Sequence, residues 1–293
     1  NISLKSLIND QFLIEDLKIV TKEIKLNDII TLIRTFKNSP QLFVLSTIIK
    51  DGFVTATINL NFDKRGKIKE NYKIEGAVKK AKLSILNKFK LKNLNFGFDI
   101  KKNNYSLKQI DTKFNGIKMT SPSIKVKKNK NSFFVNGQIS QDIKNFDIKM
   151  FKLIFANLLK DINIQKIEFS SKNKISFNIN KDFKIDNLNI ESNVDLNQLI
   201  VSQKNLKLKP YFPSFVDGIK LEKQKIVINY NNDRLDVNGN GNIIFEDKSD
   251  TISYQVTKND ANLLFESKIN IKNNSLSIDF LDYKKKEGLS SLV

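Results

Sequence analysis

The sequence has no cysteine and no histidine. Without cysteine the chain forms no disulfide and no thiolate metal site, which is compatible with an oxidising compartment. Without histidine it lacks the commonest general base and the commonest metal ligand, so Ser-His-Asp triads, Cys-His pairs and His-rich zinc sites are excluded. We therefore expect no enzymatic activity, no cofactor and no metal site.

Glycine and proline are scarce, with 10 and 4 residues among 293. This scarcity argues against linkers and low-complexity arms. Hydrophobic residues make up 40% and charged residues 28% of the chain, so a sizeable core is possible. The length suits one large β domain or two ordinary ones.

Long apolar runs are missing as well. The sequence contains no signal segment and no run of about 18 apolar residues, so we expect no membrane-spanning segment in it. Because it opens on Asn1 rather than on Met, we interpret it as a piece of a longer protein, with a targeting segment upstream.

The formal net charge of +19 comes almost wholly from lysine, since Arg34, Arg65 and Arg234 are the only arginines. Asn and Ile are abundant too, and the three residue types together indicate an AT-rich coding sequence. Two interpretations stay open. The charge attracts an anionic membrane or nucleic acid, or it is a solvated surface of biased composition.

Apolar and polar residues alternate over much of the chain, as in Val54–Phe62. A strand sends alternate side chains to opposite faces, so this pattern predicts an antiparallel sheet with one apolar and one solvated face. Polar clusters such as Asp63–Gly66 and Asn231–Asp233 predict tight turns and hence a meander. The residues predicted on the apolar face are Val54, Ile58, Leu60, Phe62, Leu94, Phe96, Phe98, Ile100, Ile175, Phe177, Ile179, Ile226, Ile228, Tyr230, Leu276, Ile278 and Phe280.

Two segments have helical periodicity, about residues 27–37 and 147–160. Asn27 is a candidate N-cap of the first, and Pro40 lies just past its end. Either amphipathic helix could lie on a membrane surface or cover an end of the sheet.

A degenerate repeat spaces apolar residues at i, i+2, i+5 and i+7, as in Phe12–Ile19 and Phe183–Ile190. A straight strand would turn the second pair to the polar face. The chain must therefore bulge or turn at the polar pair between them, such as Glu15-Asp16, Lys92-Asn93 or Asp186-Asn187. We interpret these pairs as regular bends in a curved sheet, with tight turns between short strands as the alternative.

No constellation predicts chemistry. Acidic residues lie almost wholly on polar phases or in turns, so paired catalytic carboxylates are not indicated. Asn238–Asn242 suits a bend in a strand better than a phosphate-binding loop. The aromatic residues at positions 96, 98, 133 and 177 are in phase with aliphatic residues, so they do not form an exposed stacking platform for nucleic acid.

The apolar face itself is the remaining candidate site. Acyl chains need only apolar area, worth roughly 25 cal/mol per Å² buried. A closed β-sandwich or barrel would show the same alternation, because its apolar face packs on itself. The pattern alone does not separate the two forms.

Three stretches resemble a known family: Leu17–Phe36, a strand leading into a helix; Ile58–Ile85, with a Phe-Asp-x-x-Gly turn and a Tyr-x-Ile-x-Gly-x-Val strand; and Phe114–Ile139, ending in Val-x-Gly-x-Ile. In them the chain is similar to the AsmA-like superfamily of envelope proteins, closest in style to its YhdP- and TamB-type members.

The resemblance implies a periplasmic protein that is anchored to the inner membrane by a segment outside this chain. It also implies a β-taco-like trough along which phospholipid moves toward the outer membrane, with acyl chains as partners and membranes at the ends of the full-length protein. Nucleic acid is not an expected partner. The alternatives are a closed β domain acting as envelope scaffold or adhesin-like binding module and, more remotely, a basic nucleic-acid-binding protein.

These expectations define a layout. We expect an elongated, curved, mostly antiparallel sheet forming an apolar-lined groove, with two short amphipathic helices. Strands and a helix occupy residues 1–40, a β repeat region 41–146, a helix 147–161, a second β repeat region 162–281 and a polar tail 282–293.

Overall fold

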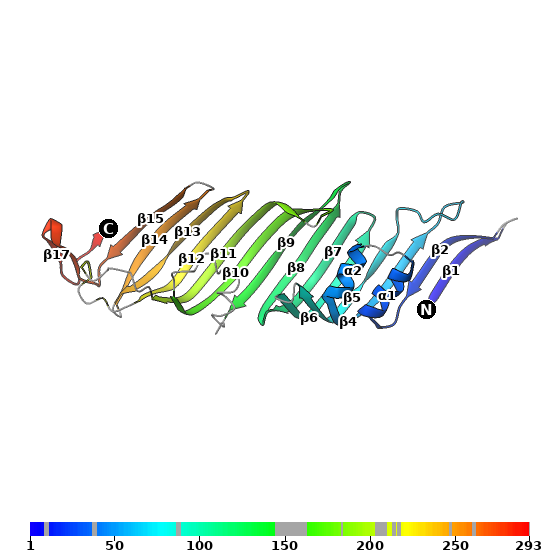
Figure 1. The fold of residues 1–293 in the computed structure, drawn as a ribbon, viewed down its shortest axis with the longest axis horizontal. Helices are drawn as coiled ribbons and strands as arrows, with labels where there is room; N and C mark the ends of the chain where they lie inside the picture. The colour runs from blue at the N-terminus through cyan, green and yellow to red at the C-terminus, as the bar shows by residue number, and fades with distance from the viewer. Residues whose placement is uncertain are drawn as a thin grey trace. The chain divides into compact units, whose positions relative to one another are not determined.

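A computed structural model of the chain describes residues 1–8, 12–36, 40–85, 89–143, 163–182, 184–202, 210–212, 215, 218–245, 248–259 and 262–292. These residues are mainly β and form a 16-stranded antiparallel sheet, a small two-stranded sheet and two α-helices (Figure 1). The sheet does not close on itself. This confirms the prediction of a mainly β, antiparallel fold with two helices, and it differs from the closed sandwich that alternation also allowed.

The strands follow one another in space almost as they do in sequence, in the order β1-β2-β4 and onward to β15-β18, with β3 beside β4. The sheet is thus the predicted meander. Its strands are β1 Ile2–Ile8, β2 Phe12–Val20, β3 Ile24–Lys25, β4 Ile49–Asn61, β5 Lys73–Ile85, β6 Phe89–Lys101, β7 Asn104–Phe114, β8 Ile117–Lys128, β9 Ser132–Ile143, β10 Asn163–Asn180, β11 Ile185–Ser202, β12 Ile219–Asn231, β13 Arg234–Phe245, β14 Lys248–Lys258, β15 Leu263–Ile271 and β18 Ser291–Leu292.

Residues 272–292, which follow β15, form further elements. β16 (Leu276–Ile278) and β17 (Tyr283–Lys285) form a separate two-stranded sheet around a 3₁₀ helix, η1 (Asp279–Leu281). The range 282–293, which we expected to be a polar tail, therefore contains β17 and β18. Lys285 within it is 4% exposed.

The chain divides into two compact units. Unit 1 comprises residues 1–139 and 175–186, and unit 2 comprises residues 140–174 and 187–293. Each unit contributes strands to the sheet and has its own buried cluster.

Helix α1 (Leu26–Phe36) confirms the helix predicted at residues 27–37. Helix α2 (Pro40–Ile48) was not predicted, because we interpreted Pro40 only as a terminator. Proline also suits the first residue of a helix, where the missing N–H has no partner to lose. The helix predicted at residues 147–160 lies outside the described residues.

The predicted bends occur as bulges within continuous strands. Asn93 in β6 and Asn187 in β11 have φ of 52° and 50°, the left-handed conformation that asparagine tolerates best among non-glycine residues. In the β1–β2 pairing Lys5 faces Asp16 and Ser6 faces Ile14, so Glu15 is the extra residue. Tight turns between short strands are therefore wrong at these three positions.

Unit 1 has an aliphatic core beneath α1. Val54, Val78, Ala81 and Leu94 are buried on β4, β5 and β6, and side chains of α1 pack against them. Gly52 permits the close approach of the layers, because a Cβ there would lie 2.7 Å from the Ala81 Cα and 2.8 Å from the Leu26 Cδ1.

Unit 2 has an aromatic core. The rings of Phe212 and Phe245 stack with centroids 4.3 Å apart, and Phe215 meets Phe245 edge-on at 6.5 Å. Phe245 is only 1% exposed, and Ile271 and Leu276 complete the buried cluster.

A polar network fixes the turn that follows β15. Asp250 Oδ1 accepts hydrogen bonds from the backbone N–H groups of Lys272 and Asn273, each at 2.8 Å. On the same turn, Lys285 Nζ donates to the carbonyl oxygens of Asn274 at 2.6 Å and Lys272 at 3.2 Å. A carboxylate thus satisfies the donors of one turn while an ammonium group satisfies its acceptors.

The segment Asn238–Asn242 lies within β13 and pairs with β14 without interruption. The irregularity predicted for it is in the neighbouring strand, where Lys223 has φ of 49° and the β12–β13 register shifts. The glycines serve packing instead: a Cβ at Gly239 would lie 2.2 Å from the Tyr254 ring, and one at Gly241 would lie 2.7 Å from Gln224.

Candidate apolar binding face

The apolar face of unit 1 is built from rows of residues that lie opposite one another on adjacent strands. One row passes from Ile58 to Ile74 and Ile100, and continues to Tyr105 and Val126. These residues come from β4, β5, β6, β7 and β8. The antiparallel register therefore gathers side chains that are far apart in sequence into a continuous apolar band.

A second row lies beside the first. It contains Ala56, Gly76, Phe98, Leu107 and Ile124. A Cβ at Gly76 would lie 2.7 Å from the Phe98 Cζ, so the ring lies over this glycine. The small residues at positions 56 and 76 thus leave space that an aromatic ring partly fills.

Exposure divides the apolar face of unit 1 into a covered and an uncovered part. Val54 and Leu94, next to Leu26 and Ile29 of α1, are 7% and 9% exposed. Ile58 and the aromatic and aliphatic residues of β6 at positions 96, 98 and 100 are only half-buried. In Figure 1, α1 and α2 lie across β4 and β5, where both helices contact the sheet.

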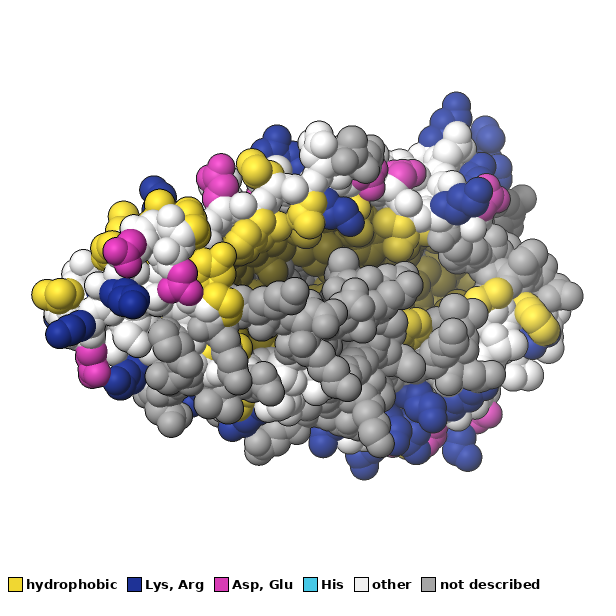
Figure 2. Space-filling view, turned by 60° about the vertical axis from the view of Figure 1, so that its left-hand side comes forward, with side chains coloured by type: hydrophobic (Ala, Val, Ile, Leu, Met, Phe, Trp, Pro, Cys, Tyr) yellow, Lys and Arg dark blue, Asp and Glu magenta, His cyan; other side chains and the backbone are white. Residues whose placement is uncertain are grey.

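Unit 2 has a comparable apolar face. Ile228 lies opposite Val237, which lies opposite Val256, and Val256 lies opposite Phe265. Ile226, Ile228 and Tyr230 are half-buried, and Phe265 is 60% exposed. Hydrophobic side chains gather on one face of the molecule in Figure 2, while most lysine and arginine side chains lie outside that patch.

Most of the predicted face residues lie on strands of the large sheet, in β4, β6, β10 and β12. Phe62 lies just beyond β4 and forms an isolated bridge with Ile68. Three residues lie elsewhere. Leu276 and Ile278 belong to the small β16–β17 sheet, and Phe280 is 81% exposed in η1, so we leave these three out of the site.

Sequence reasoning missed several members of the band. Ile74, Tyr105, Leu107 and Val126 complete rows that the predicted residues begin. Their signal was present, since Ile74 belongs to the Tyr-x-Ile-x-Gly-x-Val strand and Tyr105 and Leu107 alternate with polar residues. The missing step was the register between strands, which alternation alone does not provide.

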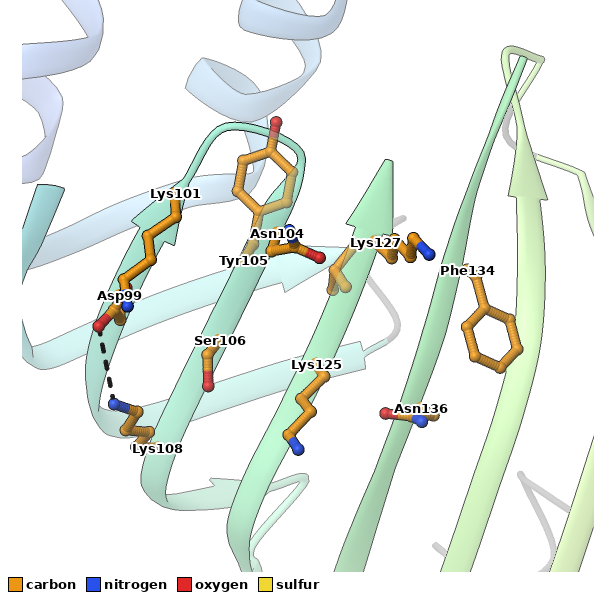
Figure 3. Close-up of a pocket in the computed structure, with 11 residues that line it drawn as sticks. Asp99, Lys101, Asn104, Tyr105, Ser106, Lys108, Lys125, Lys127, Phe134 and Asn136 are labelled. Carbon is orange, nitrogen blue, oxygen red and sulfur yellow. Dashed lines mark ion pairs between the residues drawn. The ribbon is translucent and has the colours of Figure 1, made fainter. Parts of the chain in front are cut away.

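The solvated face of unit 1 carries a shallow basic cavity of about 430 Å³ (Figure 3). Lys101, Lys108, Lys125 and Lys127 line it, against one acidic residue, Asp99. Lys108 Nζ lies 3.9 Å from the Asp99 carboxylate, as the dashed line in Figure 3 marks. The cavity therefore has an excess of positive charge.

An aromatic residue accompanies these lysines. Phe134 of β9 lines the same cavity and is 37% exposed. We had placed its neighbour Phe133 in the apolar phase and expected no aromatic residue among the exposed bases. The structure corrects that expectation at one position.

Several carboxyl groups of the solvated face form ion pairs that shift their pKa. Hydrogen bonds from Lys82, Lys73 and Arg234 lower the pKa of Asp51, Glu75 and Asp236, respectively. Burial opposes the shift only in part in each case. These side chains are thus ionised partners of basic residues.

In the described ranges, no α-helix combines the length and the apolar character that a bilayer-spanning segment needs. The same ranges hold no cluster of three or more potential metal-ligating side chains.

The chain matches no protein-family model, no curated protein and no solved structure. The case for a function therefore depends on the geometry of the sheet and on the residues of its two faces.

Proposed function

We propose that the apolar face binds phospholipid acyl chains and that the chain carries phospholipid between the inner and outer membranes as part of a periplasmic protein. The observation that supports this proposal is the row of half-buried residues from Ile58 to Val126 on an open sheet. Its inner-membrane anchor would belong to a segment outside this chain. No catalysis is involved.

The mechanism is passive. Each methylene group of an acyl chain that leaves water for the apolar face is stabilised by about 0.8 kcal/mol. The face offers few polar groups that would fix one position, so a tail can slide from row to row while its head group stays in water. Half-buried rings such as Phe98 still have exposed area that an acyl chain can contact, whereas Val54 and Leu94 are already buried.

The test is site-specific photo-crosslinking in the presence of vesicles that contain a radiolabelled phospholipid. A photoreactive residue at Ile58, Phe96 or Ile228 should form a lipid adduct. The matched control is the same residue at Lys125, on the opposite face of the sheet. Equal labelling at Lys125 and Ile58, or no adduct at any apolar position, would count against lipid binding on this face.

A charge on the band provides a second measurement. Ile58→Asp should abolish lipid transfer between donor and acceptor vesicles, because a carboxylate would have to lose its water beneath the tails. Circular dichroism and an unfolding curve separate this effect from misfolding. Lys127→Asp, on the solvated face, should leave transfer unchanged.

One observation favours a second candidate, binding of a single-stranded nucleic acid to the solvated face. Phe134 beside four lysines offers one stacking ring within a positive surface. This candidate predicts binding that falls steeply with salt and a loss on Phe134→Ala. Binding to neutral vesicles that is insensitive to salt would instead support the acyl-chain proposal.

A further inference from the structure

The basic cavity on the solvated face has an ordered arrangement of side chains that follows from the strand register. Asn104 of β7 lies opposite both Lys101 of β6 and Lys127 of β8. Two residues further along β7, Ser106 lies opposite Lys125 of β8. These side chains share the solvated face, because residues two apart on a strand point to the same side. Two neutral residues thus lie among lysines, as Figure 3 shows.

Two of the lysines that line the basic cavity have no acidic partner. Lys108 lies beside Asp99, the one acidic residue of the lining. Among the described residues, the side chains of Lys125 and Lys127 form neither an ion pair nor a hydrogen bond, and both are exposed. Their Cα atoms are about 7 Å apart along β8. Both ammonium groups are therefore available to a single anion.

Three neutral polar side chains flank these two lysines. Asn104 and Ser106 lie on one side of them, on β7, and Asn136 lies on the other side, on β9 (Figure 3). Within the part of the chain that the structure describes, none of the three forms a side-chain hydrogen bond. The serine hydroxyl can donate to an anion, and the asparagine amides can both donate to and accept from hydroxyl groups.

An exposed aromatic ring lies at the same side of the basic cavity as Asn136. Phe134 precedes Asn136 by two residues on β9 and is 37% exposed among polar groups. The face of an aromatic ring is negatively polarised, so it attracts the polarised C–H groups of a sugar ring. Contact with a sugar would also remove apolar area of the ring from water.

We propose that the basic cavity binds a sugar phosphate, that is, a phosphate monoester on a sugar ring. The phosphate group lies between Lys125 and Lys127, and Ser106 donates a hydrogen bond to one of its oxygens. The sugar ring packs on Phe134, and Asn136 forms hydrogen bonds with a ring hydroxyl.

The charge of the basic cavity matches a phosphate monoester better than a diester. A monoester carries about −1.5 to −2 charges near pH 7, whereas each phosphodiester carries a single one. The lining has four lysines against one carboxylate. A phospholipid head group or an internal phosphate of nucleic acid therefore leaves more of this positive charge unmatched than a sugar phosphate does.

The size of the basic cavity suits one sugar phosphate rather than a strand. Its volume of about 430 Å³ is in the range of small-ligand pockets. A nucleic-acid strand stacks successive bases on several rings. Here only Phe134 offers its ring, because Tyr105, the other aromatic residue of the lining, belongs to a row of the apolar face. The same sugar phosphate chemistry occurs in free hexose phosphates and in mononucleotides.

The test is equilibrium dialysis of radiolabelled glucose 6-phosphate against the full chain, in a phosphate-free buffer of low ionic strength. We expect saturable binding at a single site. Unlabelled AMP should compete with the label. Whichever of the two compounds competes at the lower concentration identifies a hexose phosphate or a mononucleotide as the source, and either order supports the proposal. Glucose, which has no phosphate, and glycerophosphoglycerol, a phosphodiester, should not compete.

Variants of the lining provide the second readout. Lys125→Gln and Lys127→Gln should each weaken glucose 6-phosphate binding about tenfold, because each removes a charge-assisted hydrogen bond. The matched control is Lys268→Gln, which removes the same charge from an exposed position in unit 2 and should leave binding unchanged. Phe134→Ala should lower the affinity for glucose 6-phosphate to that for inorganic phosphate. All four side chains are exposed, and unfolding curves verify that each variant folds.

Three results would overturn the proposal. The first is no saturable binding of glucose 6-phosphate or AMP. The second is an equal loss of binding in Lys268→Gln and Lys125→Gln, which would show attraction to net charge alone. The third is binding of an oligothymidylate without terminal phosphates in preference to AMP, which would support the nucleic-acid candidate instead. None of these results bears on acyl-chain binding, because the lining residues that hold the ligand lie on the opposite face of the sheet.

Discussion

Unit 1 and unit 2 cover their apolar faces in different ways. In unit 1 a helix covers one end of the face, where Leu26 and Ile29 of α1 pack on Val54 and Leu94. In unit 2 irregular chain does so, because Phe212 and Phe215 lie against Phe245 beside the turn that Asp250 holds. The apolar side chains of the strands are buried beneath these elements and only half-buried away from them. Burial is thus decided by the segments between the strands.

The largest expected effect contrasts two phenylalanines. Phe245→Ala should lower the free energy of unfolding by about 4 kcal/mol, because the ring is fully buried and leaves a cavity. Phe98→Ala should cost only about 2 kcal/mol, since that half-buried ring has less area to lose. Urea unfolding of the two variants measures the difference. Equal costs would mean that the face of unit 1 is as well covered as the core of unit 2.

The next largest loss of stability is expected at the turn that follows β15. Asp250→Asn should cost about 3 kcal/mol near neutral pH, because the amide cannot accept all the hydrogen bonds that the carboxylate accepts. Asp236→Asn, at an exposed pair with Arg234, is the control and should cost little.

The ionisation of Asp250 should also make the stability of the fold depend on pH. Burial raises the pKa of Asp250, but the hydrogen bonds from Asn273, Asn274 and Lys272 together outweigh it, so the net shift is downward. A lowered pKa stabilises the fold above the unfolded value of about 3.9. This stability is lost as the pH falls through the lower folded value. The free energy of unfolding of the Asp250→Asn variant should change less with pH over that acid range than that of the original chain. An equal change in both proteins would contradict the role of the carboxylate.

Under α1, Gly52→Ala should cost about 2 kcal/mol. The methyl group would press on Ala81 and Leu26, and φ at this position is +133°, which side-chain-bearing residues rarely adopt. Gly66→Ala is the matched control, with φ of +72° and no atom within 4 Å of the new Cβ. Thermal unfolding of both variants separates crowding from backbone strain, and identical losses would mean that α1 does not press on this glycine.

The smallest effect is a gain. Lys80→Gly should stabilise unit 1 by about 1 kcal/mol. Lys80 lies in a β5 bulge with φ of 53°, and this left-handed backbone conformation costs a lysine about the same free energy. Lys79→Gly, one residue earlier in the same strand, should instead destabilise by about 1 kcal/mol. A loss at both positions would show that the lysine side chain, rather than the backbone, matters at the bulge.

The sequence predicted the meander, helix α1 and the bulges at Asn93 and Asn187, because each depends on residues close in the chain. It did not predict α2, since Pro40 is compatible with both the end and the start of a helix. It assigned Leu276, Ile278 and Phe280 to the face, although those residues lie outside the large sheet, beyond the turn that Asp250 holds. Such errors have a common cause: pairing and coverage depend on contacts between distant segments.

The simple strand order has a consequence for how such a protein changes in size. Gain of one hairpin inserts two neighbouring strands, and loss of one hairpin removes two. Either change leaves the direction of both outer strands and the side of the sheet that is apolar as they were. A single-strand change would reverse one outer strand instead. Lengthening in steps of two strands therefore extends the sheet without changing the direction of its outer strands.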